Sequence, residues 1–484
     1  MVAWGCRFAL LRFYRQVLTR GLMGDAGYHF CIVRALANGK RPYTGIPEFL
    51  IKNGVDTYPI AFHRFASLFG IERVRRSPYL PNMVIFVFFA VWYCLCAEVY
   101  SPGIGLGAGL LFVVCAANVL LQKDAILFLS LSERLLARLS TGGFFLSAVM
   151  WAETGRLEFL GMSAILGGIG LITSMFARQA IFFSSAAWAL VGMNAKYLLP
   201  LAAGFSVAVL LNGRFFLAGL IDQCGFSHSY RRYTSKSRLF SSVLSRFASL
   251  RALFGKDYFF EITSREPFYM LVRHPEVLLV FAGSKLWSAP LTHLFIATGV
   301  IYFLTSTPLL NYFGEAERYV DYNLIFLLPL AAVKIAPLCP LLFCAYLAVT
   351  FAICGAGFWL DRNRVHHGND SLNSFLQDTG VGPESTVLPL PINFGQTISA
   401  RTRCRVVCYP GVYGNWIFER YIGEYPLFKP EIVPLLTEFK VTHIIVDKAQ
   451  LERFSQITGW AYKLSVYEKV AENAVWCCYN VRAT

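Results

Sequence analysis

The sequence predicts a polytopic α-helical membrane protein that carries a small soluble α/β domain at its C-terminal end. Hydrophobic residues make up 56% of the 484 residues and charged residues only 15%, and the mean hydropathy is +0.50. A soluble fold has too few interior places for so many apolar side chains. Apolar runs close to the roughly 20 residues that a spanning helix needs recur up to position 360, whereas residues 361–484 have a soluble composition.

The net charge and the cysteines narrow the classes of function. The formal net charge is +15, and the basic residues lie mostly between apolar segments, where they favour anionic lipid headgroups. No nucleic-acid-binding motif is present, so we expect membrane lipids, and no nucleic acid, as partners. The 13 cysteines lack zinc-binding spacing. In the C-terminal region, Cys404 with Cys408 and Cys477 with Cys478 form disulfides or remain buried free thiols.

About 11 spans are predicted from the apolar runs. The N-terminal segment combines an apolar face with Arg7, Arg12, Arg15 and Arg20, which favours a first span entering from the cytoplasm over an interfacial helix. The other predicted spans are 81–101, 103–121, 142–155, 157–176, 179–195, 197–211, 275–289, 291–306, 322–337 and 338–360.

These spans divide the chain into a transmembrane domain, 1–360, and a soluble domain, 361–484. Counting crossings from an inside N-terminus puts every unusual polar segment on the outer face. These segments are the first loop 24–80, the connections 122–141 and 307–321, the long basic loop 212–274, and the soluble domain. The long loop opposes the positive-inside tendency, which weakens for loops longer than about 60 residues.

The soluble domain has the pattern of a small α/β fold. Strands are expected at 385–391, 404–408, 442–446 and 475–481, where β-branched and other apolar residues cluster between turn residues. A helix is expected at 431–440, directly before the third of these strands.

Acids and histidines are concentrated in the first loop. Asp25 and His29 lie in GDAGYH, where the first span leaves the membrane, and their i, i+4 spacing would stack them on one helix face. A carboxylate at the membrane edge beside apolar walls is suited to act as a general base. The structural alternative is an N-cap aspartate beside a solvated histidine.

Asp56, Tyr58 and His63 form the second half of this loop. Tyr58 precedes a proline that suits the first turn of a helix, so much of the segment is expected to be an interfacial helix. Asp56 and His63 are secondary candidates for substrate binding, because polar groups in an apolar setting are usually functional.

A second acid, Asp124, follows Lys123 at an outer span end. The two residues can form a simple ion pair with a snorkelling lysine. Alternatively, Asp124 faces the same cavity as Asp25 and His29 and helps to bind Mg²⁺, Mn²⁺ or Ca²⁺ through oxygen and imidazole ligands. A divalent cation is therefore a candidate cofactor.

Arg318 and Tyr319 open the predicted span 322–337. A guanidinium beside a phenol hydroxyl can clamp a phosphate, although both residues are also common interfacial anchors. The sequence contains no GxSxG, Walker A, GxGxxG or HExxH motif, so serine hydrolase, ATPase and nicotinamide-enzyme functions have no support.

Three patches together resemble the GT-C superfamily of polytopic glycosyltransferases, which includes the protein O-mannosyltransferases and the aminoarabinose transferases. GDAGYH followed by TYPIAFH is similar to the acidic first outer loop of that family. ERYVDYNLIFLLPL is similar to its arginine–tyrosine span start, and EYPLFKPEIVPLLTEFKVTHIIVDK to the soluble tail of bacterial members.

The resemblance implies transfer of a sugar from a polyprenyl-phosphate-linked donor to a hydroxyl of a glycan, lipid or protein acceptor. Asp25 would correspond to the catalytic acid, which activates the acceptor while the anomeric carbon inverts. Arg318 and Tyr319 would bind the donor phosphate. Many family members have a second acid directly after the first, but Ala26 occupies that place here. A bacterial inner membrane, with the active site and soluble domain extracytoplasmic, is the expected location.

Two other classes of function compete with this reading. A transporter or lipid flippase also uses polar groups within the membrane, but such proteins tend to show internal repeats and mid-membrane charges. The acids here cluster at span ends instead. A non-catalytic scaffold that displays the C-terminal domain leaves the one-sided clustering of Asp25, Asp124 and Arg318 unexplained.

Overall fold

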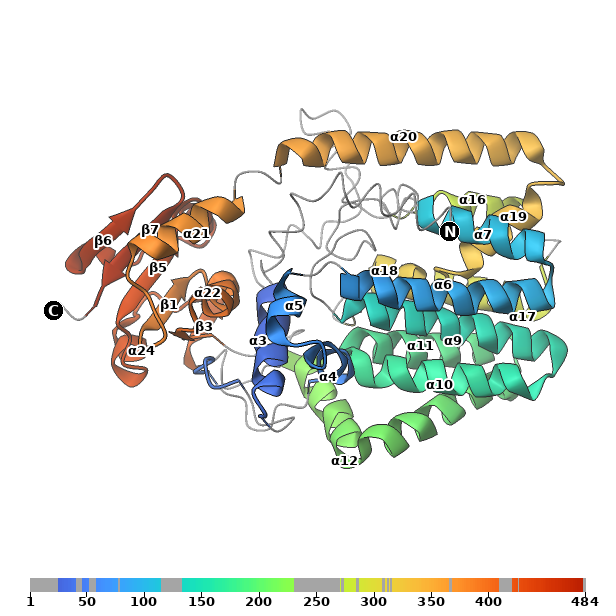
Figure 1. Cartoon of the computed structure of the whole chain (residues 1–484), viewed down its shortest axis with the longest axis horizontal. Helices are drawn as coiled ribbons and strands as arrows, with labels where there is room; N and C mark the ends of the chain where they lie inside the picture. The colour runs from blue at the N-terminus through green and yellow to red at the C-terminus, as the bar shows by residue number, and fades with distance from the viewer. Residues whose placement is uncertain are drawn as a thin grey trace.

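The computed structural model consists of a helical bundle and a smaller C-terminal unit built on a mixed sheet (Figure 1). It describes residues 25–40, 46–51, 58–76, 79–114, 133–229, 270, 274–283, 287–306, 310, 313, 316–364, 368–408, 420–424 and 426–481. The N-terminal arginine-rich segment, Asp56, Asp124 and most of the long basic loop lie outside these residues.

The bundle contains long apolar helices together with several shorter ones. They are α6 Tyr79–Val99, α7 Pro102–Val114, α9 Arg134–Thr154, α10 Leu157–Thr173, α11 Met175–Val191, α12 Leu199–Ser229, α16 Glu276–Ala282, α17 Ala289–Ser306, α18 Ala316–Asn323, α19 Leu327–Ile335 and α20 Pro340–Arg364, with the 3-10 turn η1 Ala195–Leu198 before α12. Two of them, Arg134–Thr154 and Ala195–Gly225 (η1 with α12), are long and apolar enough to cross a membrane by length and composition.

Several predicted spans differ in extent from the helices. The segment 275–289 contains only the short helix α16, and 322–337 is divided between α18 and α19. Residues 316–332 are almost wholly buried, so this region forms the centre of the bundle and not a lipid-facing wall. Helix α9 begins eight residues before the predicted start at 142, which places Arg138 inside the helix. The number of spans stays a prediction.

Small residues allow the central helices to approach closely. A Cβ added to Gly204 of α12 would lie 3.3 Å from the Gly167 Cα of α10, so the two backbones are in contact. On α9, a Cβ at Gly142 would lie 2.2 Å from Ile325 Cγ2. This pattern is typical of helix packing in membranes, where close van der Waals contact drives association.

One end of the bundle, here called the far end, is tied together by polar side chains. Glu153, near the end of α9, accepts hydrogen bonds from the Tyr100 hydroxyl at 3.2 Å and from the Ser288 hydroxyl. Lys334 of α19 lies 3.7 Å from the centroid of the Tyr100 ring. Exposed ion pairs of Arg156 with glutamates of α6 and α10 add charge at this end.

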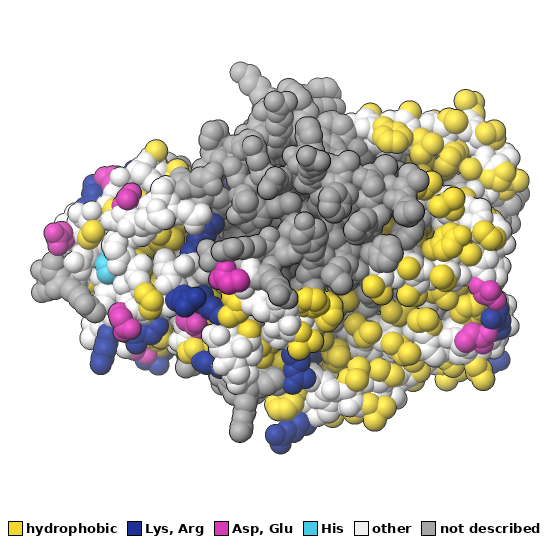
Figure 2. Space-filling view, in the orientation of Figure 1, with side chains coloured by type: hydrophobic (Ala, Val, Ile, Leu, Met, Phe, Trp, Pro, Cys, Tyr) yellow, Lys and Arg dark blue, Asp and Glu magenta, His cyan; other side chains and the backbone are white. Residues whose placement is uncertain are grey.

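The other end of α9 carries Glu133. Twenty residues of helix separate Glu133 from Glu153, which corresponds to about 30 Å, the thickness of a bilayer's hydrocarbon core. On the face shown in Figure 2, hydrophobic side chains cover the helices, while charged side chains gather at the far end and over the C-terminal unit. This arrangement suits a bundle that spans a membrane.

The C-terminal unit is a five-stranded mixed sheet in the order β2-β1-β5-β7-β6. Its strands are β1 Thr386–Leu390, β2 Arg405–Val406, β5 His443–Asp447, β6 Glu468–Glu472 and β7 Trp476–Asn480, with a hairpin of β3 Ile422–Glu424 and β4 Leu427–Phe428 beside them. Its helices are α21 Gly368–Asp378, α22 Gly395–Thr402, α24 Val433–Glu438 and α25 Lys448–Thr458. The strands β2-β1-β5 run parallel, and β5-β7-β6 run antiparallel.

All four strands predicted in the soluble region are present, and the predicted helix at 431–440 corresponds to α24. No element was predicted in the segments that form the hairpin β3–β4, strand β6 and helices α22 and α25. Cys404, Cys408, Cys477 and Cys478 are buried free thiols, so the alternative of disulfides at these pairs does not hold.

The first loop shares a hydrophobic core with this C-terminal unit. Helices α3 Asp25–Ala37, α4 Ala61–Ser67 and α5 Ile71–Arg76 contribute buried side chains to the same cluster as the strands β1, β2 and β5. Figure 1 shows α3 between the sheet and the bundle. The predicted division at 360 stays a prediction, but the packing unit of the C-terminal region also contains residues of the first loop.

Candidate functional site

Four buried side chains from three segments of the chain meet at the end of the bundle nearest the C-terminal unit. His29 Nδ1 lies 2.8 Å from His63 Nε2, and His29 Nε2 lies 2.7 Å from Glu133 Oε2. The Tyr58 hydroxyl donates to Glu133 Oε1 at 2.6 Å. Together they form a continuous hydrogen-bonded chain, here called the histidine cluster, consisting of His63, His29, Glu133 and Tyr58.

The local sequence explains how each element delivers its side chain. Helix α3 begins at Asp25, so His29 follows one helical turn after position 25. Tyr58 and Pro59 precede α4, whose first turn carries His63 inward. Glu133 directly precedes α9, and its carboxylate makes no capping hydrogen bond but reaches His29 and Tyr58 instead.

The environment fixes the charges of the cluster. Burial, together with the proximity of His29, lowers the pKa of His63 to about 3, so this imidazole is neutral near pH 7. Burial alone raises the pKa of Glu133, but the neighbouring His29 outweighs it and holds that pKa below its usual range. Burial and the adjacent Glu133 carboxylate raise the pKa of Tyr58 well above its ordinary value. The cluster thus contains one ionised carboxylate that accepts two strong hydrogen bonds.

Among the residues that the structure describes, one polar atom of the cluster has no hydrogen-bond partner. Nδ1 of His63 is buried and unpaired, although the side chain is fully enclosed. Buried polar atoms are nearly always satisfied, and an exception calls for an explanation such as an ordered water, a bound ion or a catalytic role. Ligand atoms of His29, His63 and Glu133 lie within 4.8 Å of one another, so this group could hold a metal ion.

The types of ligand in this group indicate which metal ion it would bind. Two imidazoles and one carboxylate suit zinc and other transition ions better than Mg²⁺ or Ca²⁺, which prefer oxygen ligands. Of the three ligands expected from the sequence, only His29 belongs to this group. The side chain of Asp25 and all of Asp124 lie outside the described residues.

A second buried polar group, here called the α18 network, surrounds helix α18. His274 Nε2 is hydrogen-bonded to Asp321 Oδ1, and its Nδ1 lies 3.2 Å from Glu276 Oε1. Arg138 of α9 donates from Nε to the Asp321 carbonyl at 3.3 Å, and its Nη2 lies 3.8 Å from the Asp321 carboxylate. These contacts anchor α18 to α9.

Arg318 and Tyr319 lie on α18, one turn before Asp321. The Tyr319 ring is buried, and its hydroxyl donates to the Phe313 carbonyl at 3.1 Å. The Arg318 guanidinium is half-buried and lies 5.6 Å from the centre of the Phe176 ring. Arg318 is therefore the accessible member of the pair, and Tyr319 has a structural partner for its hydroxyl.

Helix α9 brings the two groups to one end of the bundle. Glu133 joins the histidine cluster, and Arg138, five residues later, joins the α18 network. Five residues of helix span about 7.5 Å, so α3 and α18 meet the same two turns of α9. The segments carrying Asp25 and Arg318 are therefore at the same end of the molecule.

Sequence reasoning selected His29, Tyr58 and His63, which the fold brings together, but it passed over Glu133, Arg138, Asp321 and His274. Glu133 and Arg138 lie in the segment 122–141, which the pattern assigned to an interfacial connection. The available signal was a carboxylate directly ahead of an apolar run, at a helix start. Its partner His29 is more than a hundred residues away in sequence, and no local pattern contains that pairing.

No family model matches the chain, and no curated protein matches it in sequence. Among solved structures, ArnT from Cupriavidus metallidurans in the apo state is similar, with a TM-score of 0.54 at 11% identity over 99% of this chain and 98% of that one. The same ArnT bound to undecaprenyl phosphate gives a TM-score of 0.51 at 12% identity, over 99% and 97% of the two chains.

The oligosaccharyltransferase from Archaeoglobus fulgidus, in complex with Zn and sulfate, gives a TM-score of 0.50 at 15% identity. This match covers 91% of the present chain but 66% of the archaeal one, so the chain spans just under two thirds of that protein.

These likenesses define the class of fold. The chain has the GT-C glycosyltransferase fold, that of polytopic membrane glycosyltransferases. Within this class it resembles ArnT, the aminoarabinose transferase, over nearly the whole of both chains. The resemblance seen in three short patches of sequence is thereby confirmed at the level of the fold.

Proposed function

We propose that the protein is an integral-membrane inverting glycosyltransferase. It moves a sugar from a polyprenyl-phosphate-linked donor to an acceptor hydroxyl on the extracytoplasmic face. The observation that carries this proposal is the buried histidine cluster, held at the same end of a GT-C fold as the arginine of α18. The ArnT structure bound to undecaprenyl phosphate supports a lipid phosphate as the leaving group.

Asp25 acts as the base in this proposal. It takes the proton of the acceptor hydroxyl as the oxygen attacks the anomeric carbon, and the bond to the lipid phosphate breaks with inversion. His29 lies one helical turn after Asp25 and is fixed by Glu133, so it sets the position of this part of α3. Arg318 stabilises the negative charge that develops on the lipid phosphate. Asp56 and Asp124 remain candidates for acceptor binding.

A divalent cation fits the donor set of the histidine cluster. His29, His63 and Glu133 would hold it, and His63 Nδ1 has no other partner in the described part of the chain. When bound, such an ion would supply positive charge that orients substrate oxygens. The zinc in the archaeal oligosaccharyltransferase structure belongs to that protein and makes zinc the first ion to test here.

The test is transfer by membranes containing Asp25→Asn, assayed with a radiolabelled polyprenyl-phosphate sugar. General-base catalysis contributes about 10²–10⁴-fold, so we expect transfer to fall at least about 100-fold while donor binding persists. Asp378→Asn, at an exposed position of the C-terminal unit, is the matched control and should keep full activity.

Two outcomes would contradict the proposal. If Asp25→Asn transfers sugar at a near-normal rate, Asp25 is not the general base. Movement of labelled lipid across proteoliposome membranes without any glycosylated product would assign the chain to the flippase class instead.

A further inference from the structure

Helix α3 is in direct backbone contact with the C-terminal unit. A Cβ added to Gly27 would lie 2.9 Å from the carbonyl carbon and oxygen of Gln396 and 3.0 Å from the Cα of Thr397. Cβ atoms are essentially never found this close to other heavy atoms, so only glycine allows the two backbones to approach in this way. The contact lies between Asp25 and His29, at the part of α3 that carries the candidate base.

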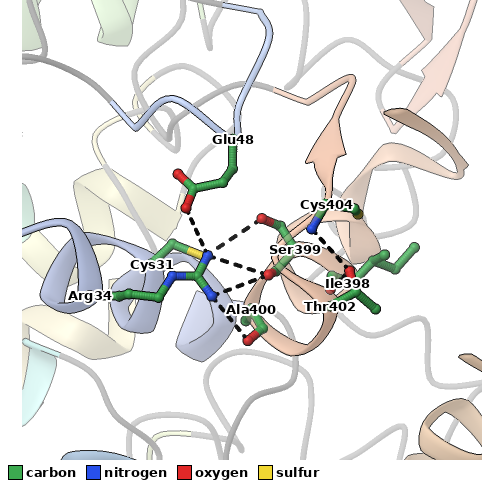
Figure 3. Close-up of polar contacts among 8 residues, drawn as sticks. All are labelled: Cys31, Arg34, Glu48, Ile398, Ser399, Ala400, Thr402 and Cys404. Atoms are coloured by element: carbon green, nitrogen blue, oxygen red, sulfur yellow. Dashed lines mark hydrogen bonds and ion pairs between the residues drawn. The ribbon is translucent and has the colours of Figure 1, made fainter. Parts of the chain in front are cut away.

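Two turns further along α3, the Arg34 side chain is hydrogen-bonded to the C-terminal end of helix α22 (Figure 3). Its guanidinium donates to the carbonyl oxygens of Ser399 and Ala400, each at 3.4 Å, and forms an ion pair with Glu48 at 3.1 Å. Its Nη2 also contacts Cys31 Sγ at 3.6 Å. Arg34 is buried, and a cation is favoured at a helix C-terminus because the helix dipole is negative there; the Ser399 carbonyl also accepts from the backbone N–H of Arg403 at 2.9 Å.

The segment that supplies Glu48 extends the domain's sheet. Val406 of β2 donates to the Glu48 carbonyl at 2.7 Å, and Leu50 donates back to the Val406 carbonyl at 3.0 Å. Ile51 donates to the Cys408 carbonyl at 3.1 Å, and Phe49 pairs with Val406 in parallel. Residues 48–51 thus cover the free edge of β2 by strand addition.

These contacts surround Arg34 with groups from α3 itself, from segment 48–51 nearby in sequence, and from α22 at the other end of the chain. We propose that Arg34 is a positioning residue, which sets the place of α3, and so of Asp25 and His29, by fastening this helix to the C-terminal domain. This inference rests on the proposed function. In this proposal the C-terminal unit holds the helix that carries Asp25 and His29 in position.

The position of α3 matters because the hydrogen bonds that its side chains form act only over a short range. His29 is five residues before Arg34, about 7.5 Å along the same helix, and its bonds to His63 and Glu133 tolerate little displacement. Removing the guanidinium leaves two helix carbonyls and Glu48 without their cation. A shift of about 1 Å in a catalytic group can cost about 100-fold in rate.

The test uses the full chain with Arg34→Ala and the matched control Arg420→Ala, whose side chain is exposed in an ion pair with Glu438 on the same domain. Undocking is measured by thiol labelling of Cys31, which is buried beside Arg34, and by hydrogen exchange of the backbone amides at 48–51. Cys96, buried inside the bundle, reports whether the whole chain opens. Transfer is measured in parallel as kcat and as KM for the lipid donor.

For Arg34→Ala we expect the labelling of Cys31 and the amide exchange at 48–51 to rise about tenfold, and kcat to fall at least about tenfold. The labelling of Cys96 and the KM for the lipid donor should stay nearly unchanged. Arg34→Lys, which keeps the charge, should recover part of kcat. Arg420→Ala should resemble the wild type in every measurement. Unchanged labelling, or increased labelling with normal kcat, would overturn the proposal.

If Arg34→Ala also exposes Cys96, the variant has lost its fold and Glu48→Gln decides the matter. This milder change keeps the carbonyl contacts of Arg34, and it should raise Cys31 labelling and lower kcat by about threefold. No change in either quantity rejects the role of Arg34. If the wild-type chain transfers no sugar at all, the proposed function fails, whereas the labelling experiment still establishes whether Arg34 docks α3.

Discussion

At the scale of single residues, the histidine cluster shows how burial and bonding set chemistry. His29 uses both ring nitrogens, one toward His63 and one toward Glu133. The same enclosure that keeps His63 neutral leaves its Nδ1 without a partner. A buried, neutral imidazole is able to accept a proton or, in the tautomer that leaves Nδ1 unprotonated, a metal ion, and its protonation is therefore coupled to folding.

This coupling predicts a pH dependence of stability. The pKa of His63 is about 3 in the folded protein and 6.5 ordinarily, so between these values the unfolded chain binds the additional proton. The stabilisation is fully present above pH 6.5 and is lost as the pH falls toward 3. Between pH 8 and pH 5 the contribution of His63 to the unfolding free energy should decrease by about 2 kcal/mol.

The measurement compares thermal unfolding of the wild type and His63→Gln at both pH values. The wild type should lose more stability than the variant over this range, although the variant is less stable at pH 8. His228→Gln, at an exposed histidine, is the control and should keep the wild-type pH dependence. Equal losses in wild type and His63→Gln would mean that His63 is not held neutral in the fold.

At the scale of elements, helix α9 is the centre of the bundle and links both polar groups. Its first turns carry Glu133 and Arg138, its middle carries Gly142 and Gly143, and its last turn carries Glu153. The glycines allow the buried residues of α18 and α19 to approach, since a Cβ at Gly142 would lie 3.3 Å from the Tyr322 carbonyl oxygen. Packing at this point therefore sets the distance between α9 and the helix that carries Arg318.

Gly142→Ala should destabilise the protein by about 1–3 kcal/mol, because the added methyl overpacks the contact with Ile325 and the α18 backbone. Gly161→Ala in α10 is the matched control, since a Cβ there meets nothing within 4 Å. It should stabilise the helix by about 0.5–1 kcal/mol through lower backbone entropy. Thermal unfolding of both variants in detergent is the measurement, and equal effects would show that α9 has room at Gly142.

At the scale of the whole molecule, the bundle has two chemically different ends. The far end carries exposed ion pairs of Arg156 and the Glu153 contacts, and the other end carries both buried polar groups and the C-terminal unit. With about 30 Å of helix between them, a membrane fits between the two ends. The parity of the predicted spans puts Arg156 inside and the C-terminal unit outside.

This topology predicts one-sided labelling in sealed right-side-out vesicles. A membrane-impermeant thiol reagent should label Arg420→Cys, on the C-terminal unit, and not Arg156→Cys, with both sites read by peptide mass spectrometry. After permeabilisation both should react, which controls for the reactivity of the two exposed positions. Labelling of both sites in intact vesicles would reject a membrane between the two ends.

The sequence by itself determined the class of fold. Composition and long apolar runs indicate whether a segment is surrounded by lipid or by water, and this does not depend on which other segments it contacts. It also located four of the five strands of the C-terminal sheet, since their apolar clusters are local signals. His29 and His63 were selected because polar groups beside apolar walls are conspicuous along the chain, and Tyr58 because it precedes a proline at an expected helix start.

Only the tertiary structure decided what these residues contact. Glu133 joins His29 across more than a hundred residues, Arg34 reaches Ser399 from the opposite end of the chain, and α9 connects α3 with α18. Such pairings arise from the packing of whole helices, and no local pattern in the sequence encodes them. The place of the first loop in the core of the C-terminal unit is decided in the same way, because burial depends on which surfaces meet.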